Sequence, residues 1–322
     1  MEFRTILDIP PYPFRIGHEQ SGLLIGSCFA TAVGERLASM KMPVNVNPFG
    51  IVYNPMSVIQ TLEAIEKGTQ FTERDLIEHN GFWFSLLHHG SFASPGKQFA
   101  LSYINESVKK GMIALENADY LILTLGTAWV YELAETGKIV NNCHKLPARD
   151  FRRRRLGVDE IVSGFHRLFE KPLYRDKKII LTVSPIRHLK DGLPENQLSK
   201  ATLLVAVHQL AEQFEQVFYF PSYEILMDDL RDYRFYDRDM VHPSVTALDY
   251  VWERFRDTFI EEDSRKLFKR IEKINAVRAH RPFNPDAAQH QAFKNAMLAE
   301  ITELRGQYPG IDFSEESIYF SE

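Results

Sequence analysis

Five short apolar segments are spaced along the chain, each bordered by a loop and a segment of helical periodicity. They lie at residues 23–26, 43–46, 120–125, 178–183 and 217–220. Residues 120–125 and 178–183 are almost continuously apolar, which is typical of central strands buried on both faces. Strands that alternate with helices predict a doubly wound α/β domain with one parallel sheet.

Helix signals separate these strands. Asn54-Pro55 has the form of a helix cap followed by a first-turn proline. The apolar periodicity predicts further helices at about 99–117, 195–215 and 245–260. Thr136-Gly137 is expected to turn a hairpin, and residues 71–95 receive no fixed role.

The character of the chain changes after residue 261. Charge-rich helical patterns occupy about 263–278 and 285–306, and Pro282-Phe283-Asn284-Pro285 separates them. We therefore expect two parts: an α/β domain over residues 1–261 and a C-terminal helical extension over residues 262–322.

Composition and charge narrow the choice of function. Of the 322 residues, 44% are hydrophobic and 25% are charged, as in ordinary globular proteins. The net charge of −5 provides no overall basic field, so we expect no nucleic acid partner. The sequence has no apolar run of about 20 residues and no secretory signal pattern, so we expect a cytoplasmic protein without a membrane partner. Glycine-rich dinucleotide and P-loop signatures are absent from the sequence.

Residues that follow strands are informative because ligands of an open parallel sheet bind outside the carboxyl ends of its strands. Ser27 and Cys28 follow the first predicted strand, Gly126 and Thr127 follow the third, and a late loop contains His242. A nucleophile, N–H donors and an imidazole are the groups that acyl transfer requires. The layout therefore predicts acyl-transfer chemistry.

Asp239 lies three residues before His242, close enough to accept a hydrogen bond from the imidazole and orient it. Structural alternatives stand beside these roles. In the structural interpretation, Cys28 is a small buried residue and Ser27 is the cap of the following helix. In the same interpretation, Asp239 and His242 only stabilise a surface loop. Their joint position in the last loop before a helix favours the catalytic interpretation.

Three further polar segments have weaker signals. Arg187-His188 follows the fourth strand and either contacts an anionic substrate or forms a loop salt bridge. Residues 142–145, Asn-Cys-His-Lys, contain too few ligands for a zinc site, so we expect no metal. The four arginines at 152–155 are expected to form a solvated face, with an acidic ligand as the minority interpretation.

Several of these segments resemble the GSCFA family over roughly residues 20–260. The resemblance is carried by five motifs: Gly26-Ser27-Cys28-Phe29-Ala30, Asn47-Pro48-Phe49-Gly50, Leu125-Gly126-Thr127-Ala128-Trp129, Ser184-Pro185-Ile186-Arg187-His188 and Asp239-Met240-Val241-His242-Pro243-Ser244. That family is grouped with the SGNH, or GDSL-like, hydrolases. The resemblance implies a three-layer α/β/α, flavodoxin-like fold and an esterase, lipase, deacetylase or O-acyltransferase activity.

The same resemblance assigns a nucleophile and an oxyanion donor. Typical members of the superfamily have a Gly-Asp-Ser turn, and that register places Cys28 at the nucleophile position, with Ser27 as the alternative. Gly50 matches the glycine donor of the second block.

The third block departs from the superfamily pattern. Typical members have an oxyanion-donating asparagine where this chain has Gly126-Thr127. Thr127 offers one hydroxyl donor, and Asn54, Asn141 or Asn142 is left to supply the missing amide. The turn amides at Cys28, Gly50 and Gly126-Thr127 are expected to bind the oxyanion.

The resulting hypothesis is an acyl-ester hydrolase or O-acyltransferase with a covalent intermediate on Cys28 or Ser27. The expected substrate is an acylated carbohydrate or another small acyl ester, with no cofactor, although transfer would need a donor such as acyl-CoA. The alternative is a non-catalytic small-molecule or glycan binding protein on the same fold.

Overall fold

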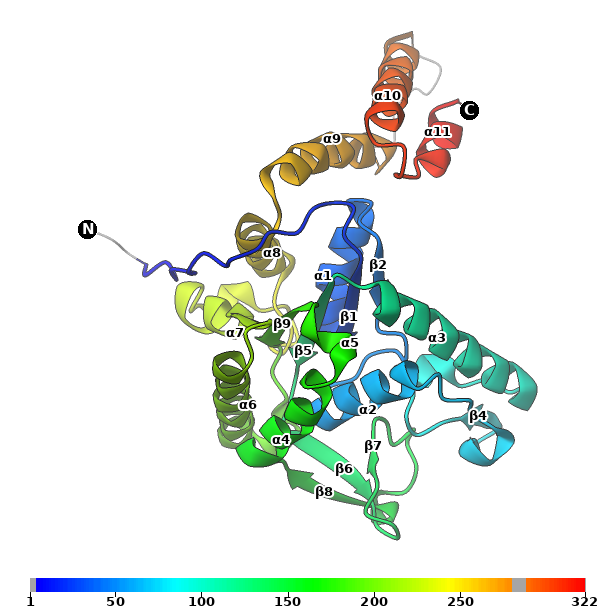
Figure 1. The fold of residues 1–322 in the computed structure, drawn as a ribbon, viewed down its shortest axis with the longest axis vertical. Helices are drawn as coiled ribbons and strands as arrows, with labels where there is room; N and C mark the ends of the chain where they lie inside the picture. The colour runs from blue at the N-terminus through cyan, green and yellow to red at the C-terminus, as the bar shows by residue number, and fades with distance from the viewer. Residues whose placement is uncertain (1–3, 280–287, 322) are drawn as a thin grey trace.

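The computed structural model describes residues 4–279 and 288–321, and a five-stranded parallel sheet lies at its centre (Figure 1). The strands lie in the order β10-β9-β5-β1-β2. This is the 2-1-3-4-5 order of flavodoxin-like folds, counted along the chain. The predicted fold class is confirmed. The strand bounds are Gly22–Gly26 for β1, Val44–Val46 for β2, Tyr120–Leu125 for β5, Lys178–Val183 for β9 and Val217–Phe220 for β10.

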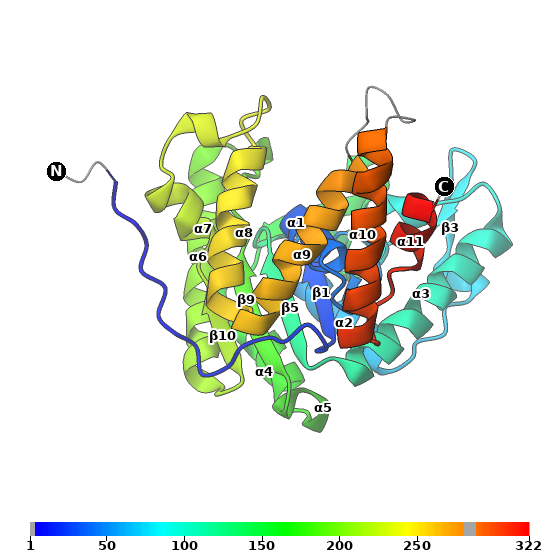
Figure 2. The same cartoon turned by 90° about the horizontal axis from the view of Figure 1, so that it is seen from above.

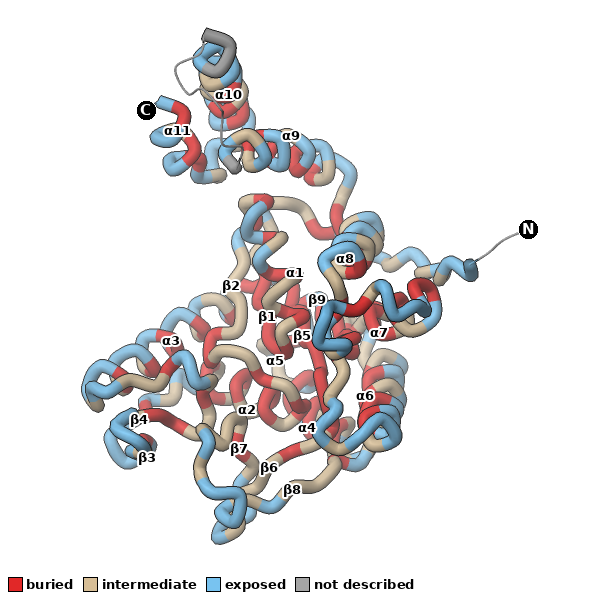
Figure 3. The backbone as a smooth tube through the Cα atoms, turned by 180° about the vertical axis from the view of Figure 1, so that it is seen from behind, coloured by how far each residue is buried: buried red, intermediate tan, exposed pale blue. Residues whose placement is uncertain are grey.

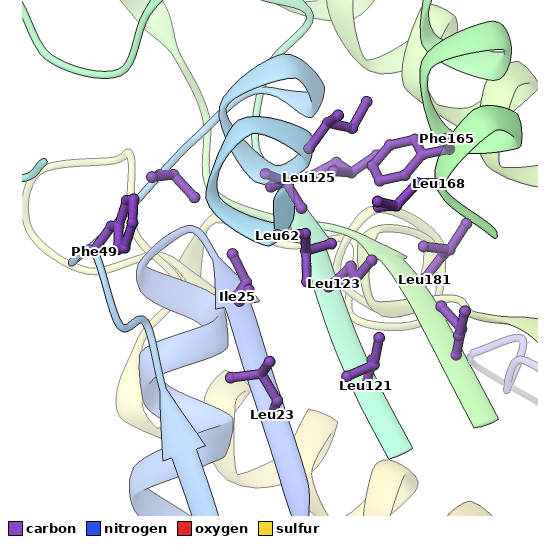
Figure 4. Packing of buried hydrophobic residues seen from close by; sticks show 14 of the residues in the cluster. Leu23, Ile25, Phe49, Leu62, Leu121, Leu123, Leu125, Phe165, Leu168 and Leu181 are labelled. Atoms are coloured by element: carbon purple, nitrogen blue, oxygen red, sulfur yellow. The ribbon is translucent and has the colours of Figure 1, made fainter. Parts of the chain in front are cut away.

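Side chains alternate between the two faces of this sheet, as strand geometry requires. Leu23 and Leu121 are aligned neighbours on β1 and β5, and both contribute to one hydrophobic cluster, whereas Leu24 contributes to the other. Figure 4 shows Leu23 and Leu121 on the first face, with Leu62 and Phe165 from the covering helices nearby. Both faces are therefore buried, which explains the almost unbroken apolar runs in the sequence.

Helices cover both faces of the sheet. The cluster containing Leu23 is covered by α2 (Pro55–Glu66), α3 (Lys97–Asn117), α4 (Val158–Phe169) and α6 (Leu193–Gln213). The cluster containing Leu24 is covered by α1 (Cys28–Ser39) and α8 (Val245–Phe259). Two short helices, α5 (Pro172–Arg175) and α7 (Ser222–Glu224), complete this part of the chain. The helices predicted at 99–117, 195–215 and 245–260 correspond to α3, α6 and α8.

A three-stranded antiparallel sheet follows β5 and was only partly predicted. It consists of β6 (Trp129–Leu133), β7 (Ile139–Val140) and β8 (Phe151–Arg155), and the hairpin at Thr136-Gly137 joins β6 to β7. The four arginines expected on a solvated face are part of β8. Arg154 is paired with Glu132 and with both carboxylate oxygens of Glu160. A small hairpin of β3 (Ile77–His79) and β4 (Phe82–Phe84) lies in the segment that had no assigned role.

The C-terminal helices are α9 (Glu262–Ala279), α10 (Ala288–Gln307) and α11 (Ser314–Ser321). Figure 2 shows α9 continuing from α8 toward α10 and α11, and Figure 3 shows these helices at the opposite end of the molecule from β6 and β8. Their apolar residues join the same cluster as α1, and Lys41 forms an ion pair with Glu316. The break expected at 282–285 and the expected helix start at 285 lie outside the described residues.

Candidate active site

A cavity of about 380 Å³ lies at the carboxyl ends of the parallel strands. Its lining comes from the loops after β1, β5 and β9, from the loops that precede α2 and α8, and from the antiparallel strands β6, β7 and β8. Cys28 and His242, more than 200 residues apart in sequence, both line it. The sequence prediction that these two segments converge at this end of the sheet agrees with this placement.

The turn after β1 places Ser27 and Cys28 differently. Gly26 has φ +151°, and a Cβ there would lie 2.2 Å from the Thr124 carbonyl oxygen, so the close approach of β1 to β5 needs glycine. Ser27 is 1% exposed and caps α1, its Oγ accepting a hydrogen bond from the Phe29 N–H at 3.3 Å. Cys28 is half-buried at the first position of α1. Both residues line the cavity, but the hydroxyl of Ser27 is engaged as the cap of α1, whereas no capping bond is found for the Cys28 thiol among the described residues.

Tyr53 is a neighbour of the thiol that the sequence analysis missed. Burial and the adjacent Cys28 side chain raise the pKa of Tyr53 to about 12. Tyr53 therefore stays a neutral phenol, which can donate a hydrogen bond to a sulfur anion. Its only sequence signal was its place between Gly50 and the cap of α2.

A tight turn before α8 joins Asp239 to His242. The carboxylate Oδ2 of Asp239 lies 2.6 Å from His242 Nδ1, and its Oδ1 accepts hydrogen bonds from the N–H groups of Val241 and His242 at 2.8 and 2.9 Å. Met240 adopts φ +57° to close the turn. These hydrogen bonds lower the pKa of Asp239 to about 2, so the carboxylate is ionised and orients the half-exposed imidazole.

Three backbone amides expected to bind an oxyanion are already engaged. Gly126 and Thr127 donate their N–H groups to the Tyr53 carbonyl oxygen at 2.7 and 3.0 Å, and Gly50 donates to the Asn47 carbonyl oxygen at 2.7 Å. Thr127 lines the cavity, but its Oγ1 lies 3.0 Å from Ser199 Oγ. The observed loop conformation does not present these N–H groups to the cavity.

Other donors are better placed. Within residues 4–279 and 288–321, the Cys28 N–H has no hydrogen-bond partner, as expected for the first position of a helix. Asn54 lines the cavity, caps α2 through Oδ1 and donates one of its two amide hydrogens to Ser57 Oγ at 2.8 Å. Asn141 also lines the cavity, whereas Asn142 lies outside its lining, with Oδ1 accepting from the His144 N–H. The Cys28 backbone N–H and the Asn54 side-chain amide are therefore the best candidates for binding an oxyanion.

Arg187 and His188 both line the cavity. Burial and the nearby cations Lys200 and Arg153 lower the pKa of His188 to about 3, so its imidazole is neutral. Its ring packs edge-on against Tyr53 at 5.8 Å, and within the described part of the chain its Nε2 is buried without a hydrogen-bond partner. The two residues occupy the predicted edge of the sheet.

Lys200 of α6 is wholly buried and was also missed by the sequence analysis. Its Nζ donates to the carbonyl oxygens of Gly126 and Ser184, each at 2.6 Å, which joins the ends of β5 and β9. Burial lowers its pKa to about 7. The lysine therefore fixes the loops that line the cavity rather than entering it.

Lys200→Met is expected to lower the free energy of unfolding by about 1–3 kcal/mol near pH 9, because two buried carbonyl groups lose their donor. The folded-state pKa of about 7 lies below the ordinary lysine value of 10.5, so the unfolded chain binds the extra proton between these values. Wild-type stability should rise with pH over that window, and the variant should lack this component. Urea unfolding at several pH values, with the exposed Lys110→Met as control, measures it. An equal pH slope in the wild type and Lys200→Met would contradict the assignment.

None of the helices in the described part of the chain is both long and apolar enough to cross a membrane. A carbohydrate esterase family 3 protein from Talaromyces cellulolyticus is similar at 9% identity and TM-score 0.33, over 79% of this chain and 99% of that one. No curated protein matches the sequence.

Two family matches cover most of the sequence. Residues 271–322 match the family described as GSCFA domain protein, C-terminal domain. Residues 22–255, which contain Cys28, Asp239 and His242, match the GSCFA family. Because this second match spans well over half of the chain, the protein belongs to the GSCFA family.

Proposed function

We propose that this GSCFA protein is an acyl-ester hydrolase or O-acyltransferase of the SGNH type, with Cys28 as nucleophile and His242 as general base and acid. The observation that carries the proposal is that Cys28 and His242 line one cavity, with Asp239 already hydrogen-bonded to the imidazole. A thiol, an oriented imidazole and nearby N–H donors match the requirements of acyl transfer.

The first half-reaction forms a thioester. His242 Nε2 takes the proton of Cys28 Sγ, and the sulfur attacks the carbonyl carbon to form a C–S bond. Charge that develops on the carbonyl oxygen is stabilised by the Cys28 N–H and by the free amide hydrogen of Asn54. The C–O bond then breaks, and the imidazolium protonates the departing alcohol oxygen.

The second half-reaction regenerates the enzyme. His242 removes a proton from water, or from an acceptor hydroxyl, and the oxygen attacks the thioester carbonyl. The C–S bond breaks, and the thiolate takes back a proton from the imidazolium. Water gives hydrolysis and a hydroxyl gives transfer, in which case acyl-CoA or another activated ester is the donor. The aromatic side chains of Trp129 and Tyr131 in the cavity wall suit a carbohydrate acceptor.

The proposal is tested by trapping the intermediate. Wild-type protein treated with p-nitrophenyl acetate or acetyl-CoA and quenched in acid is expected to carry one acetyl group on the peptide that contains Cys28. Neutral hydroxylamine should release it, because thioesters react with this reagent far faster than oxygen esters do. The mass of the digested peptides, with and without hydroxylamine, measures both properties.

Cys143→Ala is the matched control, since Cys143 is the other half-buried cysteine and lies outside the cavity lining. It should trap the acetyl group as the wild type does. A hydroxylamine-resistant adduct on Ser27 would reassign the nucleophile. Absence of an adduct and of turnover with every donor would favour the binding-protein alternative.

A further inference from the structure

The charged side chains in the cavity wall are all basic. Arg153, Arg187 and Lys190 line it, and no carboxylate does so among the described residues. The net charge of the whole chain is −5, so this local excess of positive charge runs against the overall composition. A cavity lined by one sign of charge concentrates ligands of the other sign.

These three cations differ in their ion pairs, because Arg153 has a carboxylate partner whereas Arg187 and Lys190 have none among the described residues. Arg153 forms an ion pair with Asp191, and its neighbours on β8 are paired in the same way: Arg154 with Glu132 and Glu160, and Arg155 with Glu195. Within residues 4–279 and 288–321, neither Arg187 nor Lys190 has a carboxylate within ion-pair distance. Arg187 and Lys190, the two cations close to His188 in sequence, are therefore the charged residues of the cavity wall that lack a carboxylate partner in the described part of the chain.

Aromatic rings hold both unpaired cations in place. The Arg187 guanidinium lies 3.9 Å from the ring centroid of Tyr236 and 5.3 Å from that of Tyr233. Lys190 Nζ lies 5.0 Å from the ring centroid of Tyr131 and donates a hydrogen bond to its hydroxyl. Cation–π contacts orient a charged group without neutralising it. Both side chains therefore keep N–H donors and full positive charge for a ligand.

We infer that the cavity binds substrates that carry an oxyanion group, a phosphate or a carboxylate, which Arg187 and Lys190 hold while the acyl group lies at Cys28. Guanidinium and ammonium groups are the usual protein partners of both anions. The inference deepens the proposed function and rests on it for its kinetic readout.

Three aryl acetates that differ in charge test the inference: methyl 4-acetoxybenzoate, 4-acetoxybenzoate and 4-acetoxyphenyl phosphate. Wild-type kcat/KM for at least one anionic ester should exceed that for the neutral ester, and added salt should reduce the excess. Arg187→Ala and Lys190→Ala should each lower the anionic-to-neutral ratio by about 10-fold, as loss of a charge-assisted hydrogen bond implies. The exposed Arg149→Ala, outside the cavity, is the matched control and should keep the ratio.

The outcomes distinguish a phosphate from a carboxylate as the bound group, and they test the anion site separately from the acyl-transfer function. Preference for the phosphate ester alone, or for the carboxylate alone, identifies the group that the site selects. A ratio that is near one in the wild type, or unchanged in both variants, overturns the inference. If no ester is turned over, calorimetric binding of phenyl phosphate or benzoate that is lost in Arg187→Ala supports the anion site while overturning the acyl-transfer function. Absence of both binding and preference overturns the anion site.

Discussion

Replacing Cys28 with alanine is expected to lower kcat/KM for ester turnover by about 10³-fold or more, because the variant lacks the atom that forms the acyl-enzyme. Cys28 is half-buried and lines the cavity beside Tyr53. In the part of the chain that the structure describes, its thiol caps no helix and joins no strands, so the fold should survive the change. Steady-state kinetics with p-nitrophenyl acetate, together with the thermal unfolding midpoint, measure the two effects separately.

Ser27→Ala should behave in the opposite way. Its hydroxyl is buried and caps α1, so its loss is expected to cost about 1 kcal/mol of stability with a much smaller loss of rate than Cys28→Ala. Cys143→Ala should match the wild type in rate. A larger loss of turnover in Ser27→Ala than in Cys28→Ala would assign the attack to the serine and refute the preferred register.

The five parallel strands were predictable because burial on both faces leaves a strong signal in sequence. Residues 120–125 and 178–183 match β5 and β9, which lie side by side near the middle of the sheet. The order of strands is a different matter, since it depends on how helices and loops pack in three dimensions. The flavodoxin-like order came from the family resemblance rather than from the apolar pattern.

The antiparallel sheet shows where such patterns fail. Strand β8 has the sequence Phe-Arg-Arg-Arg-Arg, without apolar alternation, so nothing local distinguishes it from a solvated run. Arg154 is held by Glu132 on the paired strand and by Glu160 on α4, and Arg155 is held by Glu195 on α6. Partners that distant in sequence become visible only after folding. The missed sheet supplies one wall of the cavity, including Trp129, Tyr131 and Arg153.

The candidate site also has features that the sequence predicted and features that it did not. Convergence of Cys28 and His242 followed from the rule that strand ends share one edge of a parallel sheet. Which backbone N–H groups are free to bind an oxyanion could not be predicted in this way. The N–H groups of Gly126 and Thr127 donate to the carbonyl oxygen of Tyr53, which comes from a separate loop. Lys200 was missed for a statistical reason: lysines are almost never fully buried, so one within a helix is assigned to solvent.

Replacing His242 with alanine is the second large effect, an expected loss of about 10²–10⁴-fold in kcat/KM, because the thiol then has no base and the leaving alcohol no acid. The imidazole is half-exposed, so the space it leaves is open to small molecules. Added imidazole should therefore restore part of the rate in His242→Ala and none in Cys28→Ala. Rescue in neither variant, combined with an intact fold and near wild-type rates in His242→Ala, would remove His242 from the mechanism.

Asp239→Asn separates orientation from proton transfer. The asparagine keeps the size of the side chain but loses the charge that steadies the imidazolium, so a rate loss approaching that of His242→Ala is expected, without rescue by imidazole. The pKa of Asp239, lowered to about 2 from an ordinary 3.8, adds a thermodynamic signature. Its stabilising effect is complete above the ordinary value and is lost as the pH falls through about 2. The difference in unfolding midpoint between wild type and Asp239→Asn should therefore narrow below about pH 4. A constant difference down to pH 2 would place the origin of the effect elsewhere than in this carboxylate.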